Sequence, residues 1–265
     1  MRIEDFYGSD EEKPLDRLVN DGGFCGIFRT IGCIGDSLSS GEFESVSPEG
    51  VKGYHDYYDY SWGQFLARMC GSVVRNFSRG GMTAKEMCEG FGDTVKLWDV
   101  DHLCQAYILA LGVNDIPRMP LGSLSDINRE DVTKNAATFA GYYAAIIQRL
   151  QKLQPQARFF LMTIPRTPTS DRAATEREDM HRALLEEMTR IFERTYLLDF
   201  RTHAPVYDAV FRKQFFLGGH MNPAGYLLTA KMVASYIDYW IRHCPEDFAQ
   251  VGLIGTPYRN YQAKW

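Results

Sequence analysis

The sequence has no long apolar run and no basic patch, and each absence removes a class of protein. Its longest uninterrupted apolar run, residues 106–113, has eight residues, whereas a membrane-spanning helix needs about 18 or more. The 29 Lys+Arg and 34 Asp+Glu give a formal charge of -5 and are scattered along the chain. The basic face that is typical of nucleic-acid binders is therefore missing.

The chain also lacks closely paired cysteines and the pattern of a signal peptide. Its six cysteines include no Cys-x-x-Cys pair, so we expect reduced, mostly buried thiols and no zinc site. The first residues, MRIEDFYGSDEEKP, are acidic and polar, where a signal peptide has a basic start and an apolar stretch. We therefore expect a cytoplasmic protein that binds neither nucleic acid nor membrane and needs no metal.

What the sequence does contain is an alternation of short apolar runs with longer segments of helical period. This alternation indicates βαβ units around a parallel sheet. The expected strands are residues 27–34, 72–77, 105–111, 157–163 and 195–200, and the clearest expected helices are residues 132–150, 175–193 and 225–242. The pattern predicts an α/β fold, a three-layer α/β/α sandwich with a five-stranded parallel sheet.

The domain organisation follows from the absence of breaks in this pattern. No linker rich in Pro, Gly or Ser and no internal repeat divides the 265 residues, so we predict one domain over residues 1–265. Residues 1–26 precede the first strand, and residues 245–265 follow the last helix. We expect these two arms to pack on the domain or on a second copy of it, which would form a homo-oligomer.

Chemically reactive residues follow the expected strands, at the sheet edge where open parallel sheets bind ligands. Ser37 lies at the start of the helix after the first strand, where backbone N–H groups favour a negative charge. Gly80 and Gly81 follow the second strand, Asn114 follows the third, and His220 lies in a loop before the last helix. Together they offer a nucleophile, two oxyanion donors and a base, which acyl transfer through a serine ester requires.

These segments resemble the sequence blocks of the SGNH (GDSL) hydrolase family of esterases, lipases, acyl-thioesterases and carbohydrate deacetylases. They occur in the family's order between Gly35 and Gly225: Gly35-Asp36-Ser37-Leu38, Gly80-Gly81-Met82-Thr83, Gly112-Val113-Asn114-Asp115 and His220-Met221-Asn222-Pro223.

The resemblance implies a flavodoxin-like SGNH hydrolase fold and a role for each matching residue. Ser37 would be the nucleophile and His220 the general base. The oxyanion hole would consist of the backbone N–H groups of Ser37 and Gly81 and the Asn114 amide, with Gly80 as the alternative second donor. The resemblance implies no cofactor, and a small-molecule ester as the partner.

One position departs from the family pattern. The family usually has an aspartate three residues before its histidine, and this sequence has Leu217 there. One alternative is that a backbone carbonyl just before His220 accepts its Nδ1 proton. Another is an acid from elsewhere, with Asp199 and Asp208 nearest in sequence, and a third is weak or absent hydrolysis. His203 is the one serious rival to His220 as base.

Other residues near these segments have simpler interpretations. Asp36 and Asp115 are expected to fix their loops by accepting backbone N–H bonds. His181 is expected on the surface of a charged helix. The aromatic segment 54–62 has two open interpretations: its rings line a lip that binds an acyl chain or a sugar, or Trp62 anchors the following helix in the core.

The sequence thus predicts a serine esterase acting on short-chain acyl or acetyl esters, with carbohydrate as one candidate alcohol. A lipase or lysophospholipase and an acyl-thioesterase are alternatives from the same family. A flavodoxin-like cofactor-binding protein is a rival of another class, although the first loop lacks a glycine-rich phosphate cradle. A non-catalytic ligand-binding protein that retains the pocket is the other rival, and Leu217 gives it weight.

Overall fold

The central sheet is parallel and has the order β4-β1-β5-β6-β7. The computed structural model describes residues 6–262; residues 1–5 and 263–265, among them Trp265 of the C-terminal arm, lie outside the described part. The strands are β1 (Thr30–Gly35), β4 (Val73–Ser78), β5 (Ala106–Ala110), β6 (Arg158–Met162) and β7 (Thr195–Leu198). All five expected strands are confirmed, with ends shifted by at most three residues.

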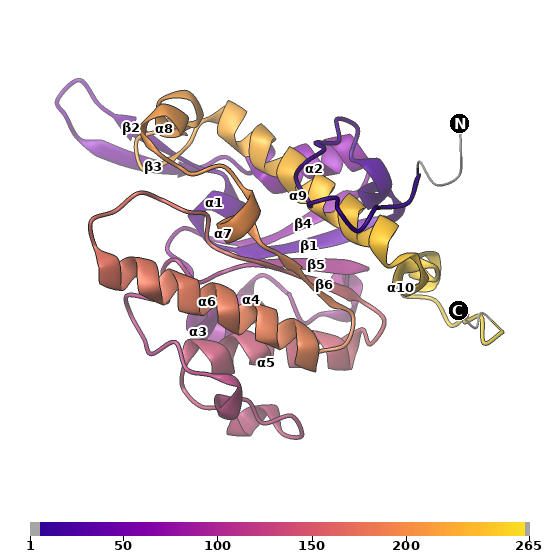
Figure 1. The fold of residues 1–265 in the computed structure, drawn as a ribbon. Coiled ribbons are helices and arrows are strands. Elements are labelled where there is room, and N and C mark those ends of the chain that lie inside the picture. Colours follow the sequence, from indigo (N-terminus) through magenta and orange to yellow (C-terminus); the bar gives the residue numbers. More distant parts are fainter. Residues whose placement is uncertain (1–5, 263–265) are drawn as a thin grey trace.

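Helices cover both faces of this sheet, with α2 and α9 on one face and α5 and α6 on the other (Figure 1). The predicted three-layer α/β/α sandwich is therefore confirmed. The α-helices are α1 (Ser37–Ser40), α2 (Trp62–Cys70), α3 (Ala84–Glu86), α4 (Gly92–Thr94), α5 (Phe139–Leu153), α6 (Arg172–Ile191), α7 (Phe200–His203), α8 (Ala209–Phe215), α9 (Pro223–His243) and α10 (Pro245–Phe248). The helix expected over residues 132–150 begins only at Phe139, because the Thr138 side chain caps it.

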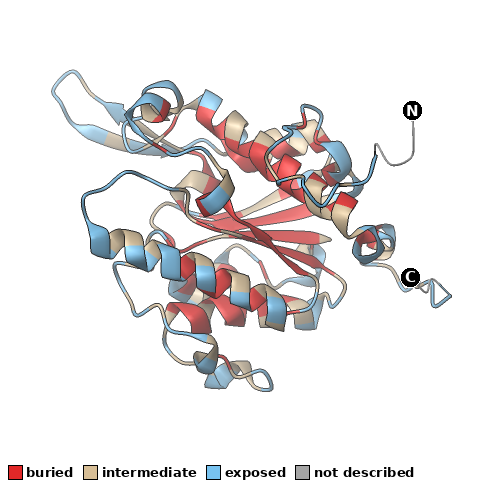
Figure 2. Cartoon of the chain, in the orientation of Figure 1, coloured by how far each residue is buried: buried red, intermediate tan, exposed pale blue. Residues whose placement is uncertain are grey.

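The strands are buried on both faces because successive side chains point to opposite helical layers. In β1, Ile31 and Cys33 pack with α2 and α9, whereas Ile34 packs with the layer of α5. Phe160 and Phe159 in β6 divide between the two layers in the same way. Figure 2 shows the resulting buried centre, with exposed residues on the outer sides of the helices.

Two short antiparallel hairpins were not expected from the sequence. One consists of β2 (Glu42–Val46) and β3 (Lys52–Asp56), and the other of β8 (Phe216–Leu217) and β9 (His220–Met221). The β2–β3 hairpin projects beyond the layers of the sandwich, next to α8 (Figure 1), and its tip is exposed (Figure 2). Its residues are mostly charged or polar, so it lacks the apolar run that identified the buried strands.

The described parts of the two arms pack on the sandwich. In the N-terminal arm, Glu12 forms an ion pair with Arg242 of α9 at 2.7 Å, and the Val19 N–H donates to Ser235 Oγ at 2.9 Å. In the C-terminal arm, Phe248 is buried in the core layer of α9. The association of two copies through the arms stays a prediction.

The structure also shows the state of the cysteines and the character of the long helices. All six cysteines are unpaired, and four of them are buried. Between residues 6 and 262, no helix is both long and apolar enough to cross a membrane.

Candidate active site

The nucleophile candidate Ser37 lies directly after β1, as its position in the sequence predicts. Asp36 caps α1, and its Oδ1 accepts the Leu38 N–H at 3.0 Å. The expected loop-fixing role of Asp36 is thereby confirmed. The helix that Ser37 begins has four residues, so a helix dipole contributes little at this position, and stabilisation of an oxyanion depends on individual N–H donors.

The loops after β4 and β5 bring the predicted oxyanion residues together. Asn114 Nδ2 donates to the Met82 carbonyl at 3.3 Å, and Arg118 donates to the Gly81 carbonyl at 2.9 Å. Asp115 Oδ1 accepts the Ala84 N–H at 2.7 Å, so the expected structural role of Asp115 is also confirmed. Asn114 therefore lies against the segment that contains Gly81.

Gly80 and Gly81 differ in what surrounds them. Gly81 has a φ of +70°, and a Cβ there would meet only open space. A Cβ at Gly80 would collide with the carboxylate of Glu42. The left-handed backbone of Gly81 favours glycine, and Gly80 leaves room for the Glu42 side chain.

The base candidate His220 lies in β9 between two glutamates of β2. Its Nδ1 is 2.8 Å from Glu44 Oε1, and its Nε2 is 3.1 Å from Glu42 Oε1. The three side chains are largely buried, with exposed fractions of 17% for His220, 13% for Glu42 and 12% for Glu44. No hydrogen bond between Ser37 Oγ and His220 is present among the described residues.

Of the alternatives for the group at His220 Nδ1, the structure shows an acid from elsewhere in the chain, but this acid is Glu44. Neither a backbone carbonyl nor Asp199 nor Asp208 faces Nδ1, because Glu44 occupies that position. The Gly219 N–H also donates to Glu44 Oε1, at 2.7 Å. Leu217, at the position of the usual family aspartate, is 50% exposed. The signal that could have identified this acid is the Glu-x-Glu spacing, which places both glutamates on one face of a strand.

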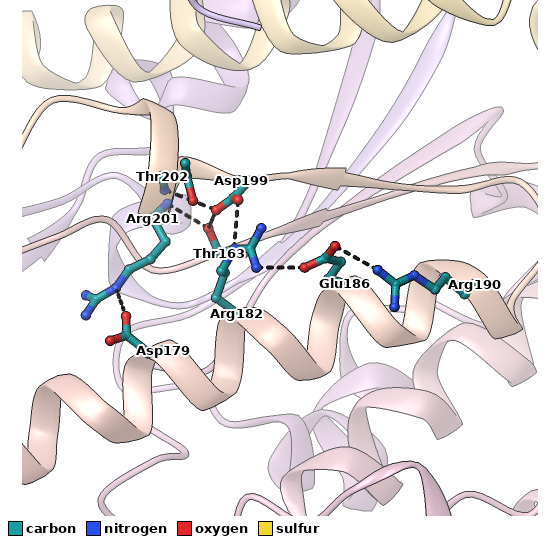
Figure 3. A network of polar contacts seen from close by, with 8 residues as sticks. All are labelled: Thr163, Asp179, Arg182, Glu186, Arg190, Asp199, Arg201 and Thr202. Atoms are coloured by element: carbon teal, nitrogen blue, oxygen red, sulfur yellow. Dashed lines mark hydrogen bonds and ion pairs between the residues drawn. The ribbon is translucent and has the colours of Figure 1, made fainter. Parts of the chain in front are cut away.

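Asp199 instead belongs to a polar network that joins α6 to the ends of β6 and β7 (Figure 3). It accepts hydrogen bonds from Arg182 Nε at 2.8 Å, the Thr202 N–H at 3.1 Å and Thr163 Oγ1 at 3.3 Å. Asp208 caps α8 through the Phe211 N–H. Both carboxylates therefore stabilise local structure.

The other histidines do not replace His220. His203 ends α7, where its ring faces Tyr236 of α9 at a centroid distance of 6.1 Å. His181 was expected at the surface, and this is wrong, because the residue is fully buried. Its Nε2 lies 3.2 Å from the Leu111 carbonyl, and burial lowers its pKa to about 4. The neutral His181 ring packs beside Gly112, at the base of the loop that carries Asn114.

Burial also changes the acidity of the carboxylates around the site. It raises the pKa of Asp36 to about 7 and that of Asp115 to about 6. Burial raises the pKa of Glu42 against the opposing charge of His220. For Glu44, burial raises the pKa, but the hydrogen bonds from His220 and the Gly219 N–H together lower it by more. The net shift of the Glu44 pKa is therefore downward. Glu44 is thus the more stable carboxylate of the pair.

A small apolar pocket of about 70 Å³ lies beside the nucleophile loop. Asp36 and Leu38, which flank Ser37, and Met221, which follows His220, line this pocket. The core side chains of Trp62, Met162 and Tyr207 also line it. Trp62 is only 1% exposed, so its interpretation as a core anchor is confirmed. Among residues 6–262, no cluster of three or more His, Cys, Asp or Glu side chains could hold a metal ion.

Comparison with known proteins agrees with this arrangement. The model of the GDSL-like lipase/acylhydrolase family matches residues 33–228. Similar solved structures include two family 2 carbohydrate esterases, from Clostridium thermocellum (16% identity, 79% of this chain and 63% of that chain covered, TM-score 0.54) and from Corynascus thermopiles (18%, 84% and 67%, TM-score 0.55). The esterase EstA from Pseudoalteromonas sp. is also similar (16%, 81% and 100%, TM-score 0.50). No curated protein matches the sequence.

The five-stranded parallel sheet and its two helical layers are those of the SGNH hydrolase fold. The chain belongs to the GDSL-like lipase/acylhydrolase family, and as a member of that family it is a serine carboxylic ester hydrolase. The family expected from the sequence is therefore confirmed. The roles of Ser37, Gly81, Asn114 and His220 stay predictions.

The buried Asp36 predicts that stability depends on pH. Because its pKa rises from 3.8 to about 7 on folding, the folded state binds this proton more tightly than the unfolded chain. The resulting stabilisation is complete below about pH 3.8 and is lost as the pH rises through about 7, which should lower the free energy of unfolding by about 2–4 kcal/mol. Urea denaturation at several pH values across this range measures the slope of the free energy of unfolding against pH. Asp36→Asn retains the acceptor for Leu38 and should reduce the slope; an unchanged slope contradicts the assignment.

The network around Asp199 predicts a loss of stability without a loss of chemistry. Asp199→Asn removes one of the two carboxylates that pair with Arg182, the other being Glu186. It should lower the free energy of unfolding by about 1–3 kcal/mol, while kcat for an ester substrate stays within about twofold of wild type. Asp208→Asn is the matched control, because Asn caps a helix as well as Asp does. A large fall in kcat for folded Asp199→Asn would return this residue to the list of catalytic candidates.

Proposed function

We propose that this protein hydrolyses short-chain acyl esters through a covalent intermediate on Ser37. The observation that carries the proposal is that the chain neighbours of Ser37, Asn114 and His220, namely Leu38, Val113 and Met221, line one small apolar pocket. Asn114 also donates to Met82, next to Gly81. Each residue type fits one of the tasks of acyl transfer, and the family match supports the reaction class.

The reaction proceeds in two halves. His220 Nε2 accepts the proton of Ser37 Oγ while Oγ attacks the ester carbonyl carbon, and the carbonyl oxygen becomes an oxyanion. When this intermediate collapses, the bond to the alkoxy oxygen breaks, and His220 donates its proton to the departing alcohol. A water molecule then gives a proton to His220 and attacks the acyl carbon. Collapse of the second intermediate releases the acid and returns the proton to Ser37.

Three donors serve the oxyanion in this scheme: the Ser37 and Gly81 backbone N–H groups and the Asn114 amide. Asn114 now donates to the Met82 carbonyl at 3.3 Å, a distance at the long end of the hydrogen-bond range. A substrate oxyanion offers a charged acceptor, which forms a shorter and stronger bond. Asn114 therefore stabilises the transition state more than the ground state, as catalysis requires.

The pocket supports a short acyl group. Its volume of about 70 Å³ is about half that of a 150 Å³ cavity that holds benzene, so an acetyl or propionyl chain fits and a long fatty acyl chain does not. On the alcohol side, the exposed ring of Tyr54 packs edge-on against His220. Such a ring offers a face on which a sugar can stack. Acetylated carbohydrate is therefore our preferred substrate class. The two carbohydrate esterases with similar structures share the fold of this protein.

Two variants test the catalytic centre. Ser37→Ala removes the nucleophile and should abolish nearly all hydrolysis of p-nitrophenyl acetate. Asn114→Ala removes one oxyanion donor and should lower kcat by about 10²- to 10³-fold with a smaller change in KM. Steady-state kinetics on folded variants measure both effects. Wild-type activity of Ser37→Ala would reject the mechanism, and absence of hydrolysis by the wild-type protein would favour a non-catalytic binding role.

A panel of acyl chain lengths tests the pocket. For p-nitrophenyl esters, kcat/KM should be highest with acetyl or propionyl groups and fall by about tenfold or more at octanoyl, because the longer chain exceeds the pocket. Acetylated sugars and an acyl-thioester complete the panel. Highest activity on long-chain esters would indicate a lipase or lysophospholipase, and highest activity on the thioester would indicate an acyl-thioesterase.

A further inference from the structure

We propose that Glu44 of β2 is the positioning acid for His220, and that Glu42 of the same strand holds the opposite ring nitrogen until a bound substrate displaces it. This inference rests on the proposed function, because it assigns both glutamates a role in proton transfer from Ser37. It answers the question that Leu217 raises. The acid that the loop before His220 lacks is supplied by a hairpin 176 residues earlier in the chain.

Glu44 has the geometry of an orienting acid. One carboxylate oxygen accepts from His220 Nδ1 at 2.8 Å and from the Gly219 N–H at 2.7 Å. Because an ionised carboxylate only accepts hydrogen bonds, the proton of neutral His220 is held on Nδ1. Nε2 is then the nitrogen that carries the free lone pair, which is the form that can take a proton from Ser37.

The glycines before His220 leave room for this acid. A Cβ at either Gly218 or Gly219 would collide with the Glu44 carboxylate. Gly218 also has a φ of +77°, which favours glycine. The β8–β9 turn is therefore shaped to accept a side chain from β2. Leu217, the residue at the usual acid position, does not take part, since its side chain is half exposed.

Glu42 acts on the other ring nitrogen, and its effect on catalysis is opposite. Its Oε1 lies 3.1 Å from Nε2, on the side of the ring that must accept the Ser37 proton. An ionised Glu42 there favours the doubly protonated imidazole, which cannot act as a base. Catalysis therefore requires the Glu42 carboxylate to leave Nε2.

The backbone and the side chain of Glu42 are held differently. Its carbonyl accepts from Tyr226 Oη of α9 at 2.6 Å, which anchors β2. Its carboxylate, within the described residues, has no polar contact besides His220. The carboxylate packs on Gly80, which has no side chain to retain it. A substrate that enters between Gly80 and His220 can thus displace the carboxylate without moving β2.

The pH dependence of this arrangement involves every charged or titratable group that faces His220 or the two glutamates. These groups come from β2, from β3, from the residue before α1 and from α9, and they are Glu42, Glu44, Lys52, Tyr54, Asp56, Asp36 and Tyr226. Four of these groups are carboxylates, and Glu42 is the one that lies against Nε2. Removal of Glu42 alone should shift the balance towards the neutral base.

Three matched Glu→Gln variants of the same hairpin test the two roles. Glu44→Gln should lower kcat for p-nitrophenyl acetate by about 10²- to 10⁴-fold with little change in KM, because an amide can hold the wrong tautomer. Glu42→Gln should move the acid limb of the kcat/KM pH profile to lower pH and increase kcat/KM on that limb. Glu49→Gln, at the exposed hairpin turn, should match wild type across the profile.

Gly219→Ala and NMR provide a second test. The added Cβ displaces the Glu44 carboxylate, so Gly219→Ala should reproduce much of the kcat loss of Glu44→Gln. In wild type, the His220 Nδ1 proton should give a downfield proton resonance, which both variants should lose. Circular dichroism verifies that the variants are folded.

The possible results separate this inference from the proposed function. If Ser37→Ala is inactive but Glu44→Gln retains kcat within about threefold, Glu44 is not the positioning acid, and the esterase mechanism stands. If Glu42→Gln loses activity as severely as Glu44→Gln, Glu42 is part of the catalytic machinery, and its displacement is rejected. If Ser37→Ala retains wild-type activity, the proposed function itself fails.

Discussion

The mechanism that we propose depends on one hydrogen bond between segments far apart in the chain, from His220 Nδ1 to Glu44 Oε1. His220 lies in a strand of two residues, which cannot fix an imidazole by itself. β2 packs against β9, and we propose that the ring takes its orientation from the β2–β3 hairpin. β9 also contacts α1, which Ser37 begins, so every step that we propose for His220 depends on the position of this strand.

The second constraint is the cost of burying several carboxylates around one histidine. An ion loses hydration on burial, so each carboxylate needs either hydrogen bonds or a proton. Glu44 has the hydrogen bonds, and its pKa falls; Asp36 and Glu42 have fewer, and their pKa values rise. In the proposed mechanism, the ionised Glu44 at Nδ1 stabilises the imidazolium that forms when Ser37 loses its proton. The carboxylate at Nε2, which substrate must displace, is Glu42, the one whose pKa burial raises.

The sequence predicts the part of this structure that follows from regular patterns. Buried parallel strands are apolar runs, so all five were found, and residues directly after them, such as Ser37 and Asn114, were placed at the correct edge. Glu44 was missed because it lies in a short, largely polar strand whose contact with β9 depends on tertiary structure rather than on local propensity. His181 was misplaced for a related reason: its helix is charged overall, and one buried position among charged neighbours leaves little trace in composition.

The central claim is that Ser37 is a nucleophile activated by His220. Labelling with a fluorophosphonate tests it most directly, because such reagents react quickly only with an activated serine. After tryptic digestion, mass spectrometry should find the phosphonyl group on the peptide that contains Ser37, and Ser37→Ala and His220→Ala should both remain unlabelled. Labelling at another serine, or equally rapid labelling of Ser37 without His220, would contradict the account.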